Sequence, residues 1–134
     1  EAGTTPVLVK IAPDLTDRAI DAVADLVVQI GLDGIIATNT TLSREGLVTP
    51  AAEVDAMGAG GLSGPPLAER SVHIVRRLRD RVGADLCIIS VGGVTTAADV
   101  ADRLEAGATL VQGYTAFLYE GPFWAARLAK GLSR

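Results

Sequence analysis

The sequence predicts an α/β protein built of four βα units with parallel strands. Three observations predict this class. Short apolar runs alternate along the chain with longer stretches whose apolar residues recur at helical spacing. The runs are apolar at successive positions, which is typical of parallel strands covered by helices. Each run is followed by glycine or polar residues. The 134 residues are enough for one domain.

The first two units lie within residues 6–37. Pro6 opens the apolar run 7–9, which ends at Lys10 and predicts a buried strand. A helix should begin after Thr16, a suitable N-cap, and end at Gly31. Residues 34–37 predict the second strand.

A long connection over 38–66 separates the second strand from the next helix. It is rich in Gly, Ser, Thr and Pro, and irregular segments of this length are usually functional or disordered. After it we expect a helix over 68–82 and a strand over 86–91. A helix capped by Thr95 or Thr96 should then run to 106, followed by a strand over 109–112. The last helix is expected over 122–131, anchored by Phe123 and Trp124.

The composition narrows the classes of function. The net charge is −4, and the densest basic cluster, within 76–81, has the helical spacing of a solvated face, so we expect no nucleic-acid partner. The only cysteine, Cys87, allows no disulfide within the chain. No cluster of His, Cys, Asp and Glu has metal-ligand spacing, and His73 is expected at the surface.

The chain shows no targeting or membrane segment. No apolar run approaches the roughly 20 residues that span a bilayer, and no signal peptide is visible, so we expect the chain alone to be soluble. The sequence starts at Glu1 without an initiator methionine, which indicates a cut start.

The residues that follow the strands are the candidates for chemistry, because α/β proteins gather function at the carboxyl ends of their strands. Lys10 either contacts a ligand or is a rim lysine that reaches water or pairs with Asp14. The cluster 38–41 either holds a planar heterocycle with carbonyl and N–H groups or forms a hydrogen-bonded turn.

Two further strand ends are rich in glycine. Gly92-Gly93 and Gly113-Tyr114-Thr115 suit a phosphate site, because (β/α)8 barrels often bind phosphate after their last two strands. A tight turn is the alternative for the glycine pair. The glycine-rich segment 58–67 indicates either backbone close to a ligand or a flexible lid. No dinucleotide or P-loop motif is present.

Five of these segments occur together in one known family. They are Val9-Lys10-Ile11-Ala12-Pro13-Asp14-Leu15, Thr38-Asn39-Thr40-Thr41, Gly60-Gly61-Leu62-Ser63-Gly64-Pro65-Pro66-Leu67, Val91-Gly92-Gly93 and Gly113-Tyr114-Thr115. In order and spacing the chain resembles the class 2 dihydroorotate dehydrogenases over essentially its whole length. The resemblance implies that residues 1–134 are a single partial domain, the C-terminal half of an FMN-binding (β/α)8 TIM barrel.

The resemblance also implies an activity, in which FMN oxidises dihydroorotate to orotate in pyrimidine biosynthesis and the electrons pass to a quinone. The implied FMN contacts are Lys10, Thr38, Gly64, Gly93, Tyr114 and Thr115, and the implied orotate contacts are Asn39 and Thr40. Lys10 would lie near the pyrimidine edge of the flavin, and the last three FMN contacts would hold its phosphate. The family's catalytic base is a serine of the first barrel half, which Ser43, Ser63 and Ser90 do not match, so no catalytic residue is assigned.

The resemblance further implies that the full-length protein is peripheral, at the cytoplasmic side of the cell membrane, and that it meets quinone through an N-terminal part missing from this chain. Two alternatives remain open. The chain could belong to another phosphate-binding barrel enzyme, such as an isomerase or aldolase. It could also be a non-catalytic half-barrel that folds as a homodimer or with the missing half, because open sheet edges invite strand pairing. Because the resembling class takes its base from the first barrel half, the isolated fragment is expected to be inactive as a dihydroorotate dehydrogenase.

Overall fold

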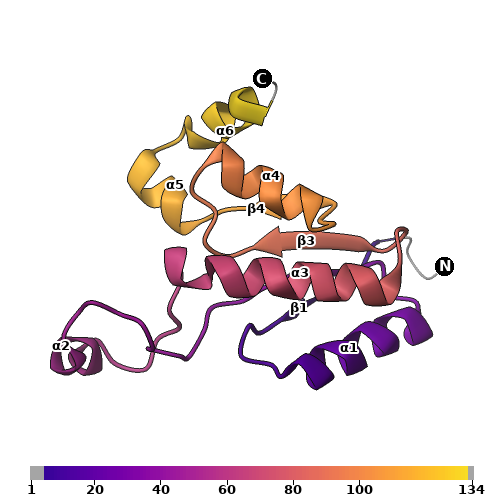
Figure 1. The fold of residues 1–134 in the computed structure, drawn as a ribbon, viewed down its shortest axis with the longest axis horizontal. Coiled ribbons are helices and arrows are strands. Elements are labelled where there is room, and N and C mark those ends of the chain that lie inside the picture. The colour runs from indigo at the N-terminus through magenta and orange to yellow at the C-terminus, as the bar shows by residue number, and fades with distance from the viewer. Residues whose placement is uncertain (1–4, 133–134) are drawn as a thin grey trace.

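The computed structural model describes residues 5–132, in which four strands alternate with helices (Figure 1). The elements are β1 (Leu8–Ile11), α1 (Asp17–Ile30), β2 (Gly34–Ala37), α2 (Ala51–Ala56), the short 3-10 helix η1 (Pro65–Leu67), α3 (Ala68–Val82), β3 (Cys87–Val91), α4 (Ala97–Glu105), β4 (Leu110–Gln112), α5 (Thr115–Glu120) and α6 (Trp124–Leu132).

The strands form one parallel sheet in the order β1-β2-β3-β4. Four βα units can belong either to an open doubly wound sheet or to half of a closed barrel, and the strand order favours the barrel. In a doubly wound sheet the strand order reverses at a switch point, whereas in a barrel each strand lies beside the next one in the chain. The sheet is therefore a barrel segment of four βα units, as predicted.

Helices cover one face of the sheet. Ile35 and Ile88 are fully buried on this outer face, in one core with Ile20 of α1 and Ile74 of α3. Burying each such side chain stabilises the fold by about 1.5–3 kcal/mol. On the opposite, inner face the neighbouring residues Lys10, Ile36, Ile89 and Leu110 stand in register across the four strands. The inner face is more accessible, and Leu110 is exposed.

The helix termini agree with their sequence signals. The Thr16 hydroxyl accepts from the Ala19 N–H at 3.2 Å at the start of α1. Thr96 and Asp99 form a capping box at the start of α4. Burial raises the pKa of Asp99, but backbone N–H groups of Thr96 and Thr95 donate to its carboxylate and bring the pKa below the ordinary value.

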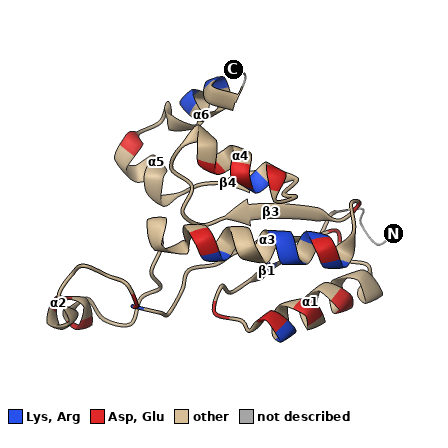
Figure 2. Cartoon of the chain, in the orientation of Figure 1, with Lys and Arg blue, Asp and Glu red and all other residues tan. Residues whose placement is uncertain are grey.

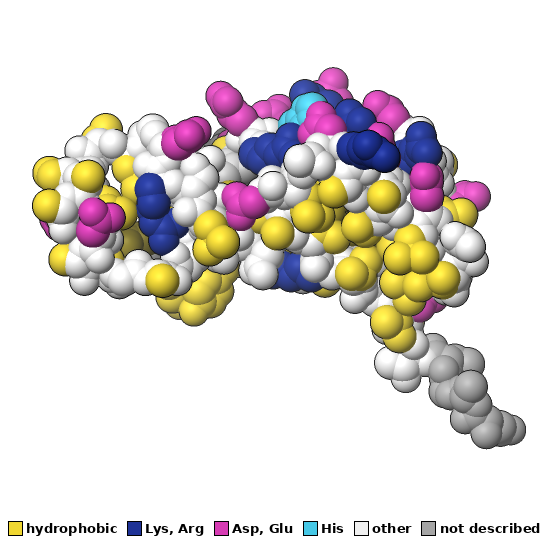
Figure 3. All heavy atoms as spheres, turned by 90° about the horizontal axis from the view of Figure 1, so that it is seen from below, with side chains coloured by type: hydrophobic (Ala, Val, Ile, Leu, Met, Phe, Trp, Pro, Cys, Tyr) yellow, Lys and Arg dark blue, Asp and Glu magenta, His cyan; other side chains and the backbone are white. Residues whose placement is uncertain are grey.

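The basic cluster on α3 lies at the surface, as predicted, and part of it forms exposed ion pairs with α1. Carboxylates one turn apart on α1 face arginines on α3, and Figures 2 and 3 show these charges gathered over the two helices. The pairs are Asp17 with Arg70 and Arg77, Asp21 with Arg77, and Asp25 with Arg81, at 2.7–3.2 Å. The hydrogen bond from Arg81 lowers the pKa of Asp25. His73 lies at this surface, as predicted, 3.3 Å from Asp17.

Two short helices were not anticipated. The connection 38–66 contains α2, which projects away from the sheet, and α5 precedes the last helix (Figure 1). Gly121, with φ of 80°, ends α5, so α6 begins only at Trp124. Trp124 anchors α6 as predicted, being 5% exposed and donating to the Thr95 carbonyl at 2.9 Å. Phe123 is 74% exposed, so the prediction that it is an anchor was wrong.

Candidate functional site

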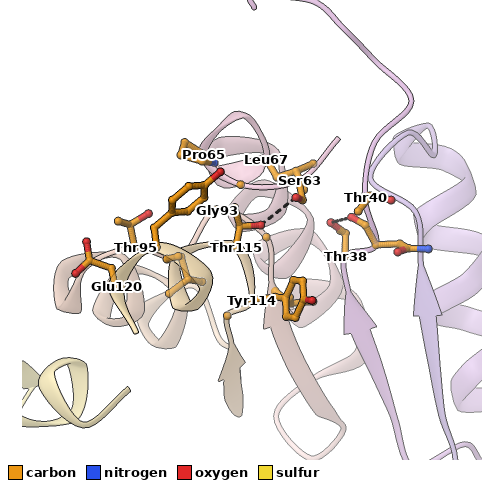
Figure 4. A pocket seen from close by; sticks show the side chains of 18 of the residues that line it. Thr38, Thr40, Ser63, Pro65, Leu67, Gly93, Thr95, Tyr114, Thr115 and Glu120 are labelled. Carbon is orange, nitrogen blue, oxygen red and sulfur yellow. Dashed lines mark hydrogen bonds between the residues drawn. The ribbon is translucent and has the colours of Figure 1, made fainter. Parts of the chain in front are cut away.

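A cavity of about 370 Å³ lies at the carboxyl ends of the strands. Its size falls within the range of about 300–1,000 Å³ typical of small-molecule sites. The structure brings every predicted site residue to this one cavity. They are Lys10, Thr38, Asn39, Thr40, Gly64, Gly93, Tyr114 and Thr115. Figure 4 shows Thr38 and Thr40 at one side of the cavity, and Gly93 and Thr115 at the other.

Lys10 reaches the cavity from the inner face of β1. Of the two interpretations left open for it, the pair with Asp14 is not formed. The Asp14 carboxylate instead accepts from the Thr41 hydroxyl and, at 3.0 Å, from the Leu42 N–H. Within residues 5–132 Lys10 has no ion-pair partner. Its ammonium is therefore available to a ligand.

The segment after β2 is held by backbone hydrogen bonds that continue the sheet. The Thr38 N–H donates to the Val91 carbonyl and the Asn39 N–H to the Ile11 carbonyl, each at 2.8 Å. Thr38 is 2% exposed, and its hydroxyl donates to the Asn39 carbonyl at 3.0 Å. Asn39 and Thr40 are exposed at the cavity, so their side chains can face a ligand.

The turn after β3 strongly favours glycine at both of its positions. Gly92 and Gly93 have φ of 120° and 72°, in the left-handed region that other residues adopt at a cost. A Cβ on Gly93 would lie 2.6 Å from the backbone nitrogen of Ala68, where α3 begins. The turn therefore packs directly against α3, which places its backbone at the rim of the cavity.

Two residues behind this turn were not predicted from the sequence. The Gly92 carbonyl accepts from Arg103 Nη2 at 2.6 Å and from Ser71 Oγ at 2.9 Å. Arg103 is 1% exposed. Burial lowers its pKa, and the nearby carboxylates of Asp99 and Asp102 oppose that shift. The signal in the sequence was its spacing, because Arg103 lies three residues after buried Val100 on the same helix face.

The glycine-rich segment 58–67 is tied to the last βα unit. Ser63 accepts a hydrogen bond from the Thr115 hydroxyl at 2.9 Å (Figure 4). Gly64 is buried, and a Cβ there would lie 3.2 Å from Thr115 Cγ2. Leu62 pairs with Thr41 through two backbone hydrogen bonds. These contacts favour backbone that lines a ligand site over a freely moving lid.

The site thus offers different groups at its two ends. A cation lies at the β1 end, and a glycine turn and threonine hydroxyls lie at the β3 and β4 end. Such a set suits an elongated ligand that has an anionic group at one end and a polar aromatic ring at the other. Within residues 5–132 no three side chains of His, Cys, Asp or Glu are grouped to hold a metal ion. In the same residues no helix combines the length and apolarity needed to cross a membrane.

A family model described as dihydroorotate dehydrogenase matches residues 1–134. The chain belongs to this family. It is 63% identical over 131 residues to the dihydroorotate dehydrogenase (quinone) of Rhodococcus opacus, covering 98% of this chain and 37% of the relative. With that of Pseudarthrobacter chlorophenolicus it shares 64% identity over 129 residues, covering 96% of this chain and 36% of the relative. The chain thus spans little more than a third of the length of these relatives.

Solved structures of the family show the same fold. The DHODH of Eimeria tenella in complex with ferulenol matches with a TM-score of 0.87 at 38% identity, over 95% of this chain and 33% of that chain. A ligand-free structure from the same organism matches with a TM-score of 0.85 at 39% identity, over 93% of this chain and 34% of that chain. The dihydroorotate dehydrogenase neighbours are TIM-barrel enzymes, which agrees with the observed strand order.

Proposed function

We propose that the protein oxidises dihydroorotate to orotate with FMN as cofactor and a quinone as electron acceptor, a step of pyrimidine biosynthesis. Residues 1–134 would supply the FMN-phosphate site and part of the orotate site. One observation carries the proposal: all eight positions that the family resemblance marks for FMN and orotate line a single cavity. The names of the relatives, dihydroorotate dehydrogenase (quinone), support the substrate and the acceptor.

The residues present fit FMN. A phosphate can be held at the glycine turn and at Thr115, because backbone N–H groups and hydroxyls are its usual donors. Lys10, which has no carboxylate partner among the described residues, would place its ammonium beside the flavin ring and stabilise negative charge there. When bound, the flavin supplies the hydride chemistry, and the protein supplies position and electrostatics.

Asn39 and Thr40 would orient the substrate ring. An asparagine amide both donates and accepts, so it can bind a ring that carries adjacent N–H and carbonyl groups. Thr40 adds a hydroxyl from the same segment, which the sheet holds in place through the Thr38 and Asn39 N–H groups. We assign no catalytic base within residues 1–134. Ser63 is engaged with Thr115, and Ser90 is fully buried on the outer face.

Further strands would complete the site. Within residues 5–132, β1 and β4 each pair on one side only. We propose that their free edges are covered by the remaining strands of a barrel or by a second copy of the chain, since open edges pair readily. We further propose peripheral association with the cytoplasmic side of the membrane, where a quinone can be reached.

An anaerobic flavin-reduction experiment tests the proposal. The complete protein is loaded with FMN, mixed with dihydroorotate, and followed by flavin absorbance. We expect the absorbance to fall and then to return when a short-chain quinone is added. An FMN-loaded protein whose absorbance does not respond to dihydroorotate would contradict the activity. A protein that takes up no flavin but binds sugar phosphates would instead be another phosphate-binding barrel enzyme.

A further inference from the structure

The guanidinium of Arg103 is almost completely buried directly behind the glycine turn of the cavity. It donates through Nη1 to the Asp99 carbonyl at 2.9 Å and through Nη2 to the Gly92 carbonyl at 2.6 Å. Its Nη2 also lies 3.4 Å from Ser71 Oγ, and its Nε is buried without a partner in the described residues. An arginine in this position sets the orientation of the peptide that it holds.

That peptide joins Gly92 to Gly93. In a planar trans peptide the carbonyl and the following N–H point in opposite directions. The Gly92 carbonyl is drawn toward the helix-covered side of the sheet by Arg103 from α4 and by Ser71 from α3. The Gly93 N–H must therefore point the other way, toward the cavity that both glycines line. Within residues 5–132 it donates to no protein acceptor.

The charge of Arg103 is only partly compensated, by the nearby carboxylates of Asp99 and Asp102. Within residues 5–132 it forms no ion pair with a carboxylate. The Asp99 carboxylate is instead bound by the N–H groups of Thr95 and Thr96, at 2.9 and 2.7 Å. A buried cation without a paired counter-ion is costly, and an anion nearby offsets that cost. The cavity adjoins the peptide that Arg103 holds, so it is the place where such an anion can bind.

We propose that Arg103 is a positioning residue for the phosphoryl group of the ligand. It holds the Gly92–Gly93 peptide with the N–H facing the phosphoryl oxygens, and it adds positive charge from behind the turn. Ser71 acts with it by donating to the same carbonyl. The inference rests on the proposed function in one respect, namely that the phosphoryl group is the phosphate of FMN.

If Arg103 had a purely structural role, its removal would weaken the binding of both flavins equally. The chain offers a matched control for that case. Arg79 on α3 donates its Nε to the Gly107 carbonyl at 2.8 Å, and Gly107 also has a positive φ, of 100°. Gly107 precedes β4, so this second arginine-to-glycine contact lies at the opposite end of the sheet from the cavity. Removing it tests loss of packing without loss of the phosphoryl site.

The test compares two flavins that differ only in the phosphate. Fluorescence titrations of the flavin-free complete protein give the dissociation constants of FMN and riboflavin for wild type, Arg103→Met, Arg103→Lys, Ser71→Ala and Arg79→Met. In Arg103→Met we expect FMN affinity to fall about 10–100-fold, the range for losing a hydrogen bond to a charged group, with riboflavin affinity unchanged. Arg103→Lys should keep part of the preference for FMN over riboflavin. Ser71→Ala should reduce this preference less than Arg103→Met does, and Arg79→Met should leave it unchanged.

The possible outcomes separate the role of Arg103 from the proposed function. A preference for FMN that survives in Arg103→Met, or an equal loss of both flavins, overturns the role of Arg103. If Arg103→Met does not fold, Ser71→Ala and Arg103→Lys carry the test, and unchanged preference in both overturns the role. A wild type that binds riboflavin as tightly as FMN overturns both proposals. A protein that binds FMN through Arg103 but is not reduced by dihydroorotate overturns the proposed function alone.

Discussion

Replacing Gly93 by alanine should damage both the stability of the fold and the phosphate site. Gly93 has φ of 72°, and an added Cβ would lie 2.6 Å from the nitrogen and 2.7 Å from the Cα of Ala68. Both are backbone atoms at the start of α3, so no side-chain rotation relieves the collision. Either the turn or the first residues of α3 must move, and a moved turn no longer presents the same N–H group to the cavity.

The stability cost of Gly93→Ala can be estimated by comparison with Gly31, a glycine of similar backbone conformation. Gly31 caps α1 with φ of 69°, and a Cβ there would meet nothing within 4 Å. Gly31→Ala should therefore cost only the left-handed backbone conformation, about 1–2 kcal/mol. Gly93→Ala carries the same conformational cost together with an overpacking cost of about 1–3 kcal/mol. The difference between the two variants isolates the collision with Ala68.

Urea denaturation of both variants of the complete protein measures the stability, and FMN titration measures the site. We expect Gly93→Ala to be the less stable variant and to bind FMN more weakly, while Gly31→Ala binds FMN like wild type. Equal stability of the two variants, or unchanged FMN affinity in Gly93→Ala, would refute the described packing of the turn.

Three other predictions follow from single contacts. Lys10→Ala should slow flavin reduction by dihydroorotate in stopped-flow absorbance, and unchanged reduction together with unchanged FMN affinity would remove Lys10 from the site. Trp124→Ala should cost about 3–5 kcal/mol in urea denaturation, whereas exposed Phe123→Ala should stay within about 0.5 kcal/mol; equal costs would contradict the assigned anchor. The folded-state pKa of Asp99 is depressed, so its capping box with Thr96 contributes stability above the unfolded value of 3.8 and loses it as pH falls through the folded pKa. The difference in melting temperature between wild type and Asp99→Ala should accordingly shrink on acidification, and a constant difference would argue against that linkage.

Much of the fold was accessible from local sequence patterns. The strands around Ile35 and Ile88 are short apolar runs, and the caps Thr16 and Thr96 have the side chains that helix starts prefer. The strand order was not accessible in this way, because βα units of the same length build open sheets and barrels alike. The glycine and polar residues that follow the strands, together with the resemblance to a known family, favoured the barrel, and the observed strand order agreed with it.

The elements that were missed lack these local signals. Helix α2 begins after Pro50 and α5 after Tyr114, and neither start has a side-chain capping hydrogen bond. Both helices are six residues long, which is too short for a clear hydrophobic period. Their positions depend on tertiary packing rather than on propensity.

The candidate site likewise contains some residues that the sequence could predict and others that it could not. Residues such as Asn39 and Thr115 directly follow strands, so the rule that strand ends carry function placed them together. Arg103 and Ser71 lie in the middle of helices, and their contacts with the Gly92 carbonyl depend on how α3 and α4 pack on the sheet. The ion pair between Asp21 and Arg77 could not be predicted either, because it forms only when α1 and α3 pack side by side.

The most direct test of the account is a titration of the purified protein with FMN, followed by flavin fluorescence and accompanied by an intact mass. Saturable binding that is abolished or weakened by Gly93→Ala is the result expected if the cavity at the strand ends is the flavin-phosphate site. Absence of binding in the complete protein, at a confirmed mass, would contradict the site and leave only shared ancestry with the dihydroorotate dehydrogenases.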